Sequence, residues 1–429
     1  MRSLLAKVSF GPFFWTQFLG AFNDNVFKNA LVIFVSMQAF SEAEVGFWVN
    51  LASGLFILPF FALSPLAGQI ADKYEKGWLI RLIKVAEIVL MLLGALTFYM
   101  QDILWMTCIL SLMGAQSAFF GPVKYSIIPQ HVDSQELVRA TGLVEMGTFV
   151  AILLGTILGG LLVRWHPLFV AVAVVILAVL GYVASWKIPH AAAGDPGLRV
   201  TYNPLPEFKQ IVTLNQDNPP LFWTIMAISW FWFYGATVLA QMPTFTTHGL
   251  YASSYYITFF LAVFTISIAF GSMLVHRISA EKINLKVAYI GIAGLIWFLF
   301  DLGFMSLDYS TSKPYDLLQP GLRLQQDGMQ ALWRDWRIVV DFTLIGVFGS
   351  FFIVPLYALL QEKSHIQYRS RMVALNNILN SLFMVLSAIF CAVLFMLGGD
   401  TSDIFQIVSL VTVGFVALAY VYRRQWQLA

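Results

Sequence analysis

The sequence contains little charge. Asp, Glu, Lys and Arg together make up only 11% of the 429 residues, whereas about a quarter of the residues of a soluble domain are charged. Hydrophobic residues make up 59% of the chain, and the mean hydropathy is +0.76. Such a chain has too few charges to cover its apolar residues with a polar surface. The composition therefore indicates an integral membrane protein.

Cysteine is also scarce. The two cysteines, Cys108 and Cys391, both fall in apolar stretches, which argues against a disulfide framework and indicates buried thiols. The sequence has no basic run and no zinc-site spacing, and its net charge is only +2. We therefore expect no nucleic acid partner, no metal and no cofactor. The first apolar run is too long for a signal peptide and lacks a small-residue cleavage site, so we expect it to be retained as a helix.

Apolar runs bounded by charge or by Gly and Pro predict twelve transmembrane helices. The predicted spans are 10–38, 45–66, 79–100, 103–121, 138–163, 167–186, 220–242, 254–276, 285–304, 337–361, 371–397 and 402–422. A polar, proline-rich stretch separates the sixth span from the seventh. We therefore predict a six-helix bundle over 1–186, a cytoplasmic linker with a short surface helix over 187–219, and a second bundle over 220–429.

The basic residues predict the orientation. Most of the 25 Lys and Arg residues lie in segments on the same side of the membrane as the N-terminus. Because Lys and Arg are enriched in cytoplasmic loops, we predict that both termini are cytoplasmic.

Asp24 lies near the middle of the first span, and Asn25 and Lys28 lie beside it. A charge at the centre of a membrane helix costs about 2.5–3.5 kcal/mol. Asp24 and Lys28 are four residues apart and can partly neutralise each other. One interpretation is a polar cavity that binds a substrate or an ion; the other is an internal pair that holds a neighbouring helix.

Further polar residues occur in the spans expected to line a cavity. Gly121 and Pro122 are predicted to break the fourth span, which would place Lys124 and Tyr125 at its cytoplasmic mouth. Lys124 could attract a phosphate or be an ordinary cytoplasmic-side lysine, and Glu145 in the fifth span could contact substrate or a gate. The eleventh span carries three asparagines that could bind a head group or link helices: Asn376, Asn377 and Asn380. For Glu87, a local pair with Lys84 is an adequate explanation.

The loop after the second span has a distinctive spacing. Gly68 is followed by Asp72 and Lys73, and the loop ends at Arg81. This pattern resembles the signature G-x-x-x-D-(R/K)-x-x-(G/R)-(R/K) of the major facilitator superfamily, and residues 271–277 form a degraded copy after the eighth span. The resemblance implies two six-helix bundles around a central cavity that alternates its access, with these four residues in gating.

Four blocks resemble a narrower family, the bacterial lysophospholipid transporters (LplT). Residues 17–25 are similar to its Gln-Phe-x-x-x-Phe-x-Asp-Asn string, and 121–125 to its Ser-Pro-Ala-Lys-Tyr. Residues 141–155 are similar to its Asn-Gly-Leu-Met-Glu and Ala-Ile-Leu-Leu-Gly, and the asparagines of the eleventh span to its Asn-x-x-x-Asn. The C-terminal half matches less well, and residues 228–233 look more like the transporter part of fusions that carry an acyltransferase.

This resemblance implies a function. The chain would flip lysophosphatidylethanolamine and related lysolipids from the outer to the inner leaflet of the bacterial cytoplasmic membrane for reacylation. Asp24 would meet the amine of the head group, and Lys28 and Lys124 its phosphate. Membrane lipids and a peripheral acyltransferase are the other implied partners. No acyltransferase domain follows Ala429 and no suitable His-x-x-x-x-Asp pair is present, so we expect a transporter and not an enzyme.

Two other functions stay open from the sequence. One is a proton-coupled exporter of small amphiphilic compounds or drugs, with Asp24 and Glu145 as proton carriers. The other is a non-transporting membrane partner that tethers an acyltransferase through its cytoplasmic loops.

Overall fold

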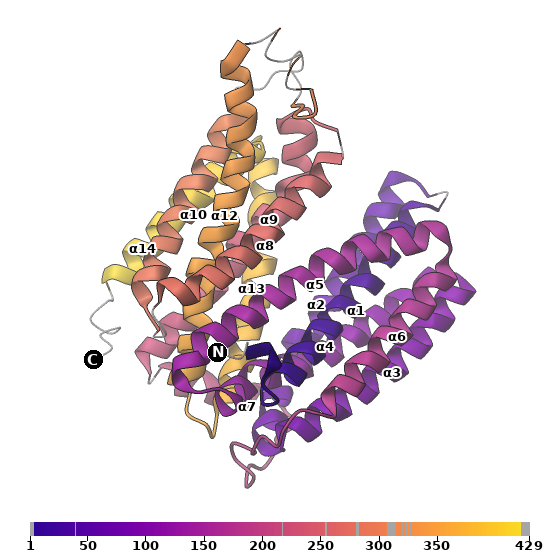
Figure 1. The fold of residues 1–429 in the computed structure, drawn as a ribbon, viewed down its shortest axis with the longest axis vertical. Helices are drawn as coiled ribbons and strands as arrows, with labels where there is room; N and C mark the ends of the chain where they lie inside the picture. The colour runs from indigo at the N-terminus through magenta and orange to yellow at the C-terminus, as the bar shows by residue number, and fades with distance from the viewer. Residues whose placement is uncertain are drawn as a thin grey trace. The chain divides into compact units, whose positions relative to one another are not determined.

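The computed structural model describes residues 4–38, 40–216, 218–253, 255–279, 283–306, 315–319, 321, 325 and 328–421. Within these ranges all regular secondary structure is helical, and loops connect the helices (Figure 1). The prediction of an all-α fold is thus confirmed for the described part of the chain.

The chain forms two compact units. Unit 1 comprises Met1–Leu221 and Ala358–Ser381, and unit 2 comprises Phe222–Tyr357 and Leu382–Ala429. Unit 1 contains α1 (Gly11–Ser36), α2 (Glu42–Lys73), α3 (Lys76–Met100), α4 (Ile103–His131), α5 (Leu137–Trp165), α6 (Pro167–Ser185) and α7 (Pro204–Gln216). Most of unit 2 consists of α8 (Pro219–Thr244), α9 (Tyr255–Ile278), α10 (Leu285–Ser306), α12 (Gly328–Lys363), α13 (Arg369–Met396) and α14 (Thr401–Val421).

The unit boundaries cut through α12 and α13. The last turn of α12 and the first part of α13 cluster with unit 1, although the rest of both helices belongs to unit 2. The division into bundles at 1–186 and 220–429 stays a prediction. The short helix expected in the linker is present as α7.

Ten helices in the described ranges are long and apolar enough to cross a membrane. The prediction of twelve spans also counts α1 and α3, which have 26 and 25 residues but are not among the ten. The exact count and the cytoplasmic termini therefore stay predictions.

Local sequence explains where several helices begin. Ser41 and Glu44 form a reciprocal capping box at the start of α2. Asp102 accepts a hydrogen bond from the backbone of Trp105 at the start of α4. Pro167 occupies the first position of α6, where a missing N–H group is tolerated.

The predicted break of the fourth span at Pro122 is wrong. α4 runs through Pro122 and Pro129 and ends only at His131. A membrane helix can accommodate an internal proline because neighbouring helices and side chains satisfy the freed backbone groups. Lys124 and Tyr125 therefore lie inside α4, about two turns before its end, and not at a mouth formed by a broken helix.

The packing of unit 1 centres on α1. This helix packs against α5 and α6, while α2 packs against α4 and α3 against α6 (Figure 1). The half of α1 that follows Asp24 enters an apolar core with α3, α4 and α6, in which Val26, Phe27 and Met91 are fully buried. The polar residues in the first half of α1, up to Asp24, therefore lie next to this apolar core.

Candidate functional site

A polar cluster lies in the interior of unit 1, where α1, α3 and α4 meet. Asp24 projects from α1 and accepts a 2.8 Å hydrogen bond from the Ser117 hydroxyl of α4. Asp24 is partly buried, and it forms no ion pair within 4.0 Å among the described residues. Its carboxylate thus has one hydroxyl donor and no direct counter-charge.

Beside Asp24 lies an ion pair that is almost completely buried. Lys84 donates to Glu87 at 2.6 Å, and their side chains are 1% and 3% exposed. The Glu87 carboxylate also accepts from Asn23 at 3.2 Å and from Gln116 at 3.4 Å. A buried pair needs such additional hydrogen bonds because desolvation otherwise outweighs the Coulomb attraction.

Sequence reasoning assigned Glu87 only a local pair with Lys84. That pair is present, but the structure extends it into a network with the helix that carries Asp24. Gln116 and Ser117 were not predicted at all, because neither residue type is unusual in a membrane helix. The available signal was their position about two helical turns before Lys124 on the same helix.

A cavity of about 80 Å³ opens at this cluster. Asp24, Lys84, Glu87, Ser117 and Lys124 all line it. Its volume is enough for a few water molecules or a small charged group, and polar walls favour both. The site can therefore accept a hydrated or charged ligand in a part of the chain that is otherwise apolar.

Gln17 and Lys124 form the second side of this cavity. Lys124 donates to the Thr148 hydroxyl at 2.8 Å, and Thr148 donates to Gln17 Oε1 at 3.2 Å. Gln17 is 1% exposed, lines the cavity and has no hydrogen-bond partner for Nε2 in the described part of the chain. A buried donor without an acceptor is costly, so a ligand oxygen would be stabilised here.

Two predicted binding residues on α1 lie apart from this cavity. Lys28 lies with Nζ 6.0 Å from the centre of the Phe56 ring, and it forms no ion pair with Asp24 within 4.0 Å. Asn25 donates to the carbonyl of Ala21 on its own helix. Neither side chain lines the cavity.

Tyr125 and Glu145 face each other. The Tyr125 hydroxyl donates to Glu145 Oε1 at 2.6 Å, and both residues are buried. Neither lines the 80 Å³ cavity. The pair joins α4 to α5, and a role in contacting substrate stays a prediction for both residues.

The asparagines of α13 lie in the part of that helix that belongs to unit 1. Asn376 and Asn380 are buried. Asn377 lies against α4, where a Cβ atom at Gly121 would be 2.5 Å from its Nδ2 atom. Gly121 therefore permits a close approach of α13 to α4, and head-group binding by these three residues stays a prediction.

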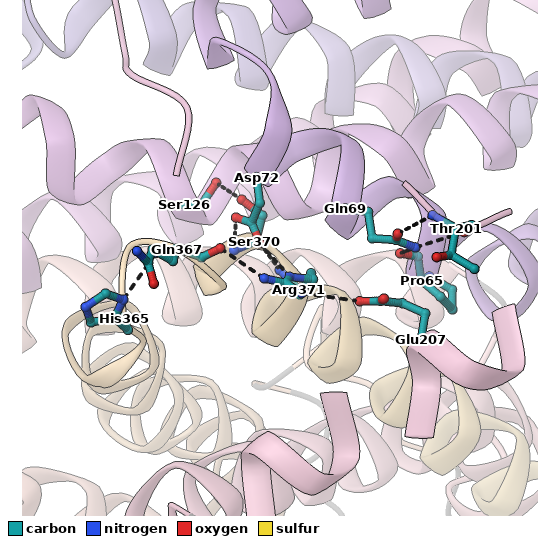
Figure 2. A network of polar contacts seen from close by, with 10 residues as sticks. All are labelled: Pro65, Gln69, Asp72, Ser126, Thr201, Glu207, His365, Gln367, Ser370 and Arg371. Carbon is teal, nitrogen blue, oxygen red and sulfur yellow. Dashed lines mark hydrogen bonds and ion pairs between the residues drawn. The ribbon is translucent and has the colours of Figure 1, made fainter. Parts of the chain in front are cut away.

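The predicted gating residue Asp72 joins the end of α2 to the start of α13 (Figure 2). Its carboxylate accepts from the backbone N–H of Ser370 at 2.9 Å and pairs with the Arg371 guanidinium at 3.2 Å. Acceptors at a helix N-terminus satisfy free N–H groups and interact favourably with the helix dipole. Gly68 makes the approach possible, because a Cβ atom there would lie 2.8 Å from that of Ala374.

Residues of the linker contact the same network. In Figure 2, Arg371 lies between Asp72 and Glu207 of α7, and its Nη1 atom is 3.8 Å from Glu207 Oε1. Gln69 exchanges hydrogen bonds with the backbone of Thr201, accepting at 2.7 Å and donating at 3.1 Å. Burial raises the pKa of Glu207, and the attraction of Arg371 opposes this shift only in part.

The other two predicted gating residues lie outside this network. Lys73 is 5.7 Å from the ring centre of Tyr74, and Arg81 is 3.7 Å from Glu75. Glu75 caps the start of α3 and accepts from the backbone of Ala191 at 2.8 Å. Burial acts to raise the pKa of Glu75, but backbone N–H donors and Arg81 together hold it below its ordinary value.

A separate apolar cavity lies in unit 2. It has a volume of about 430 Å³ and is lined by α8, α10, α12 and α14 through residues such as Ala227, Ile292, Leu356 and Val416. Its lining favours a hydrocarbon ligand. Within the described residues, no group of three or more His, Cys, Asp or Glu is arranged to hold a metal ion.

Comparisons with known proteins agree with the resemblance seen in the sequence. The sequence model of the Major Facilitator Superfamily matches residues 13–318. The lysophospholipid transporter LplT of Serratia proteamaculans (strain 568) is 28% identical over 369 residues, which cover 84% of this chain and 80% of that protein. The LplT of Escherichia coli (strain SE11) is 31% identical over 353 residues, which cover 81% and 78%.

Solved structures of other transporters share the fold. The crystal structure of the transporter FucP in the outward conformation has a TM-score of 0.71 at 10% identity and covers 98% of both chains. A bacterial homologue of the iron transporter ferroportin in its outward-facing state has a TM-score of 0.67 at 14% identity and covers 99% of this chain and all of that one. At such low identity these likenesses concern the fold alone.

Proposed function

Because the chain belongs to the major facilitator superfamily and, within it, to the lysophospholipid transporter family, we propose that it flips lysophosphatidylethanolamine from the outer to the inner leaflet. The chain is a multi-pass protein of the bacterial inner membrane and a transporter of the major facilitator fold. The substrate and the direction are the parts that we propose.

One observation carries the choice of substrate. Asp24 and Lys124 line one cavity, and neither has an opposite charge within 4.0 Å among the described residues. Lysophosphatidylethanolamine carries an ammonium group and a phosphate. An ammonium at Asp24 and a phosphate oxygen at Lys124 would give each buried charge its partner and avoid the cost of unpaired charge in an apolar region.

The other cavity groups fit the same ligand. Gln17 Nε2 is an unused buried donor and can donate to a phosphate oxygen. Lys84 and Glu87 already neutralise each other, so in this proposal they have a structural role. Asp24 and Lys124 are then the charged groups that bind the ligand. Lys28 is not needed for this contact, since it lies over Phe56.

The Asp72 network supports transport by alternating access. It ties the start of α13 to α2 within unit 1, although α13 continues into unit 2. We propose that the bonds of Asp72 to Ser370 and Arg371 form a gate at the predicted cytoplasmic end. Its opening would release the head group toward the inner leaflet, where a peripheral acyltransferase could use the lysolipid.

The single acyl chain needs only apolar surroundings. It can stay in the bilayer while the head group crosses, and the 430 Å³ cavity of unit 2 shows that apolar space is also available inside the chain. A lipid with one chain would therefore pass more readily than one with two.

The test is flipping of labelled lysophosphatidylethanolamine by the purified protein in liposomes. The label should become protected in the opposite leaflet only when protein is present, and a labelled fatty acid of the same chain length should show no protein-dependent change. Export of cationic amphiphiles by the same liposomes without any lysolipid flipping would overturn the proposal in favour of a drug exporter.

A further inference from the structure

Unit 2 contains a second intramembrane cluster of charge that lysolipid binding does not use. It consists of Asp301 on α10 and of Arg337 and Asp341 on α12. Arg337 donates from Nε to Asp301 Oδ2 at 2.9 Å and from Nη2 to the other oxygen of the same carboxylate. One guanidinium is thus fully engaged with one carboxylate in a bidentate pair.

Asp341 is the extra acid. It lies one helical turn after Arg337 on the same face of α12, and it is only 1% exposed. Its Oδ2 atom is buried and has no hydrogen-bond partner in the part of the chain that the structure describes. A buried carboxyl oxygen without a donor favours the protonated acid over the carboxylate.

The charge balance leads to the same conclusion. With both acids ionised, the cluster would hold a net negative charge in a membrane-spanning region, because the guanidinium is always singly positive. One added proton makes the cluster neutral. Two carboxylates at one site cannot both ionise without a large cost, so one proton shared between Asp301 and Asp341 removes the unfavourable charge.

The charged groups around Asp341 lie on α10 and α12, and Arg334 is a further cation on the same face of α12, two turns before Asp341. The charged groups that act on Asp341 among the described residues are Asp301 from α10 and Arg337 from its own helix. At the next position, Phe342 packs on Phe245 of η3 (Phe245–Gly249) and on Phe260 of α9, so both of these neighbours present aromatic rings. The buried Asp335 lies six residues earlier on α12, on another side of the helix.

The two members of the ion pair are more exposed than Asp341. The Arg337 side chain is 39% exposed and that of Asp301 14%, whereas Asp341 is only 1% exposed. In the site proposed below, a proton would reach the Asp341 carboxylate past the Arg337–Asp301 pair and would leave by the same groups.

We propose that Asp301, Arg337 and Asp341 form a proton-binding site in unit 2, and that uptake and release of its proton are coupled to lysolipid flipping. Each cycle binds one proton from water at the carboxyl pair and returns it to water, so no other reactant is needed. The coupling rests on the proposed function, whereas the proton site itself does not.

The first experiment measures coupling. In liposomes with an imposed pH gradient, coupling of one proton to one lysolipid changes the leaflet ratio by up to about tenfold per pH unit, and an ionophore that dissipates the gradient removes the change. Asp341→Asn replaces the acid by a neutral group of the same shape. This variant should still flip lysolipid without a gradient but should not respond to one.

The matched control is Asp403→Asn. Asp403 is an exposed acid at the start of α14 in the same unit, so this variant should respond to the gradient as the wild type does. An equal response of Asp341→Asn and wild type would overturn the proposal, as would lysolipid flipping by the wild type that ignores the gradient.

The second experiment reads the proton without transport. The infrared band of a protonated carboxylic acid at neutral pH should be weaker in Asp341→Asn than in wild type and unchanged in Asp403→Asn. An unchanged band in Asp341→Asn would refute the proton site. A weaker band in a protein that flips no lysolipid would support the site and show that the proposed function, not the proton site, is wrong.

Discussion

The interiors of the two units differ in the side chains that they bury. Unit 1 buries charges of both signs, among them Asp24, Lys84 and Glu87, beside a small polar cavity. The interior of unit 2 is built largely from stacked aromatic rings. The ring centres of Trp230 and Phe415 are 4.8 Å apart and the rings are nearly parallel, with an interplanar angle of 6°. The cavity that Phe415 helps to line is apolar.

Under the proposed function, unit 1 recognises the head group and unit 2 supports the fold. A head group with two charges needs fixed groups of opposite sign, and Asp24 and Lys124 line one cavity in unit 1. The large rings of unit 2 bury apolar area and prefer defined stacking geometries, so they give rigidity without charge. The charged cluster of unit 2 holds two acids and one cation, so it suits a proton better than a zwitterion.

The largest effect should come from breaking the buried pair of unit 1. Lys84→Met would leave the Glu87 carboxylate buried without a cation and should cost about 3–5 kcal/mol of stability. Chemical unfolding in detergent measures this loss. The double variant with Glu87→Met should recover most of it, and equal losses in the single and double variants would contradict a role for the pair in charge balance.

A medium effect should come from two glycines at matching positions in the two halves of the chain, Gly68 in α2 and Gly271 in α9. In unit 1, Gly68 approaches α13, and in unit 2 a Cβ atom at Gly271 would lie 2.9 Å from that of Ser350. Gly68→Ala and Gly271→Ala should each cost about 1–3 kcal/mol because of overpacking. Only the first should also slow flipping, since it disturbs the proposed gate at Asp72.

The control for both glycines is Gly54→Ala. Gly54 lies on α2 with nothing near its Cβ position, and alanine is the better helix former, so this change should not lower the melting temperature and should leave flipping unchanged. Equal destabilisation at Gly54 would show that the losses at Gly68 and Gly271 do not come from close packing.

A smaller effect is expected from the aromatic interior of unit 2. Trp230→Phe keeps a ring in the stack but removes the 3.2 Å hydrogen bond from the indole to Thr412. The loss of that bond should cost about 0.5–1.5 kcal/mol, seen as a lower melting temperature. Lysolipid flipping should be unaffected, and a clear loss of flipping would show that unit 2 shares in recognition.

The smallest expected effect concerns the linker. Since burial raises the pKa of Glu207, docking of α7 favours the protonated acid. Stability from this group is present at low pH and is lost as pH rises through the raised pKa. After correction for intrinsic exchange rates, hydrogen exchange in α7 should therefore increase above the ordinary carboxyl range, and Glu207→Gln should remove this dependence.

Much of the fold could be predicted from the sequence, because long apolar runs leave few alternatives to membrane helices. The break at Pro122 was wrong because a proline signal is local, whereas the packing that tolerates it is not. Asp24 could be singled out from the sequence because a lone acid in an apolar span is costly, and its role in binding substrate stays a prediction.

The partners of Asp24 were not visible. Ser117 and Gln116 come from another helix, and their approach depends on how α1 and α4 pack, which no single-sequence pattern encodes. Asp72 was identified by its spacing, but its partners Ser370 and Arg371 are separated from it by about 300 residues. The Nζ atom of Lys28 lies 6.0 Å from the ring centre of Phe56 and not beside Asp24, because helical spacing fixes a face and not a rotamer. Head-group binding by Lys28 stays a prediction.

The most direct test of the account compares two lysolipids on one variant. Asp24→Asn removes the negative charge but keeps the size of the side chain. It should slow the flipping of lysophosphatidylethanolamine by about tenfold or more, as expected for loss of a charged hydrogen bond. Lysophosphatidylglycerol, which has the phosphate but no amine, should be slowed far less. Equal slowing of both lipids, or no slowing of either, would contradict the claim that Asp24 binds the amine.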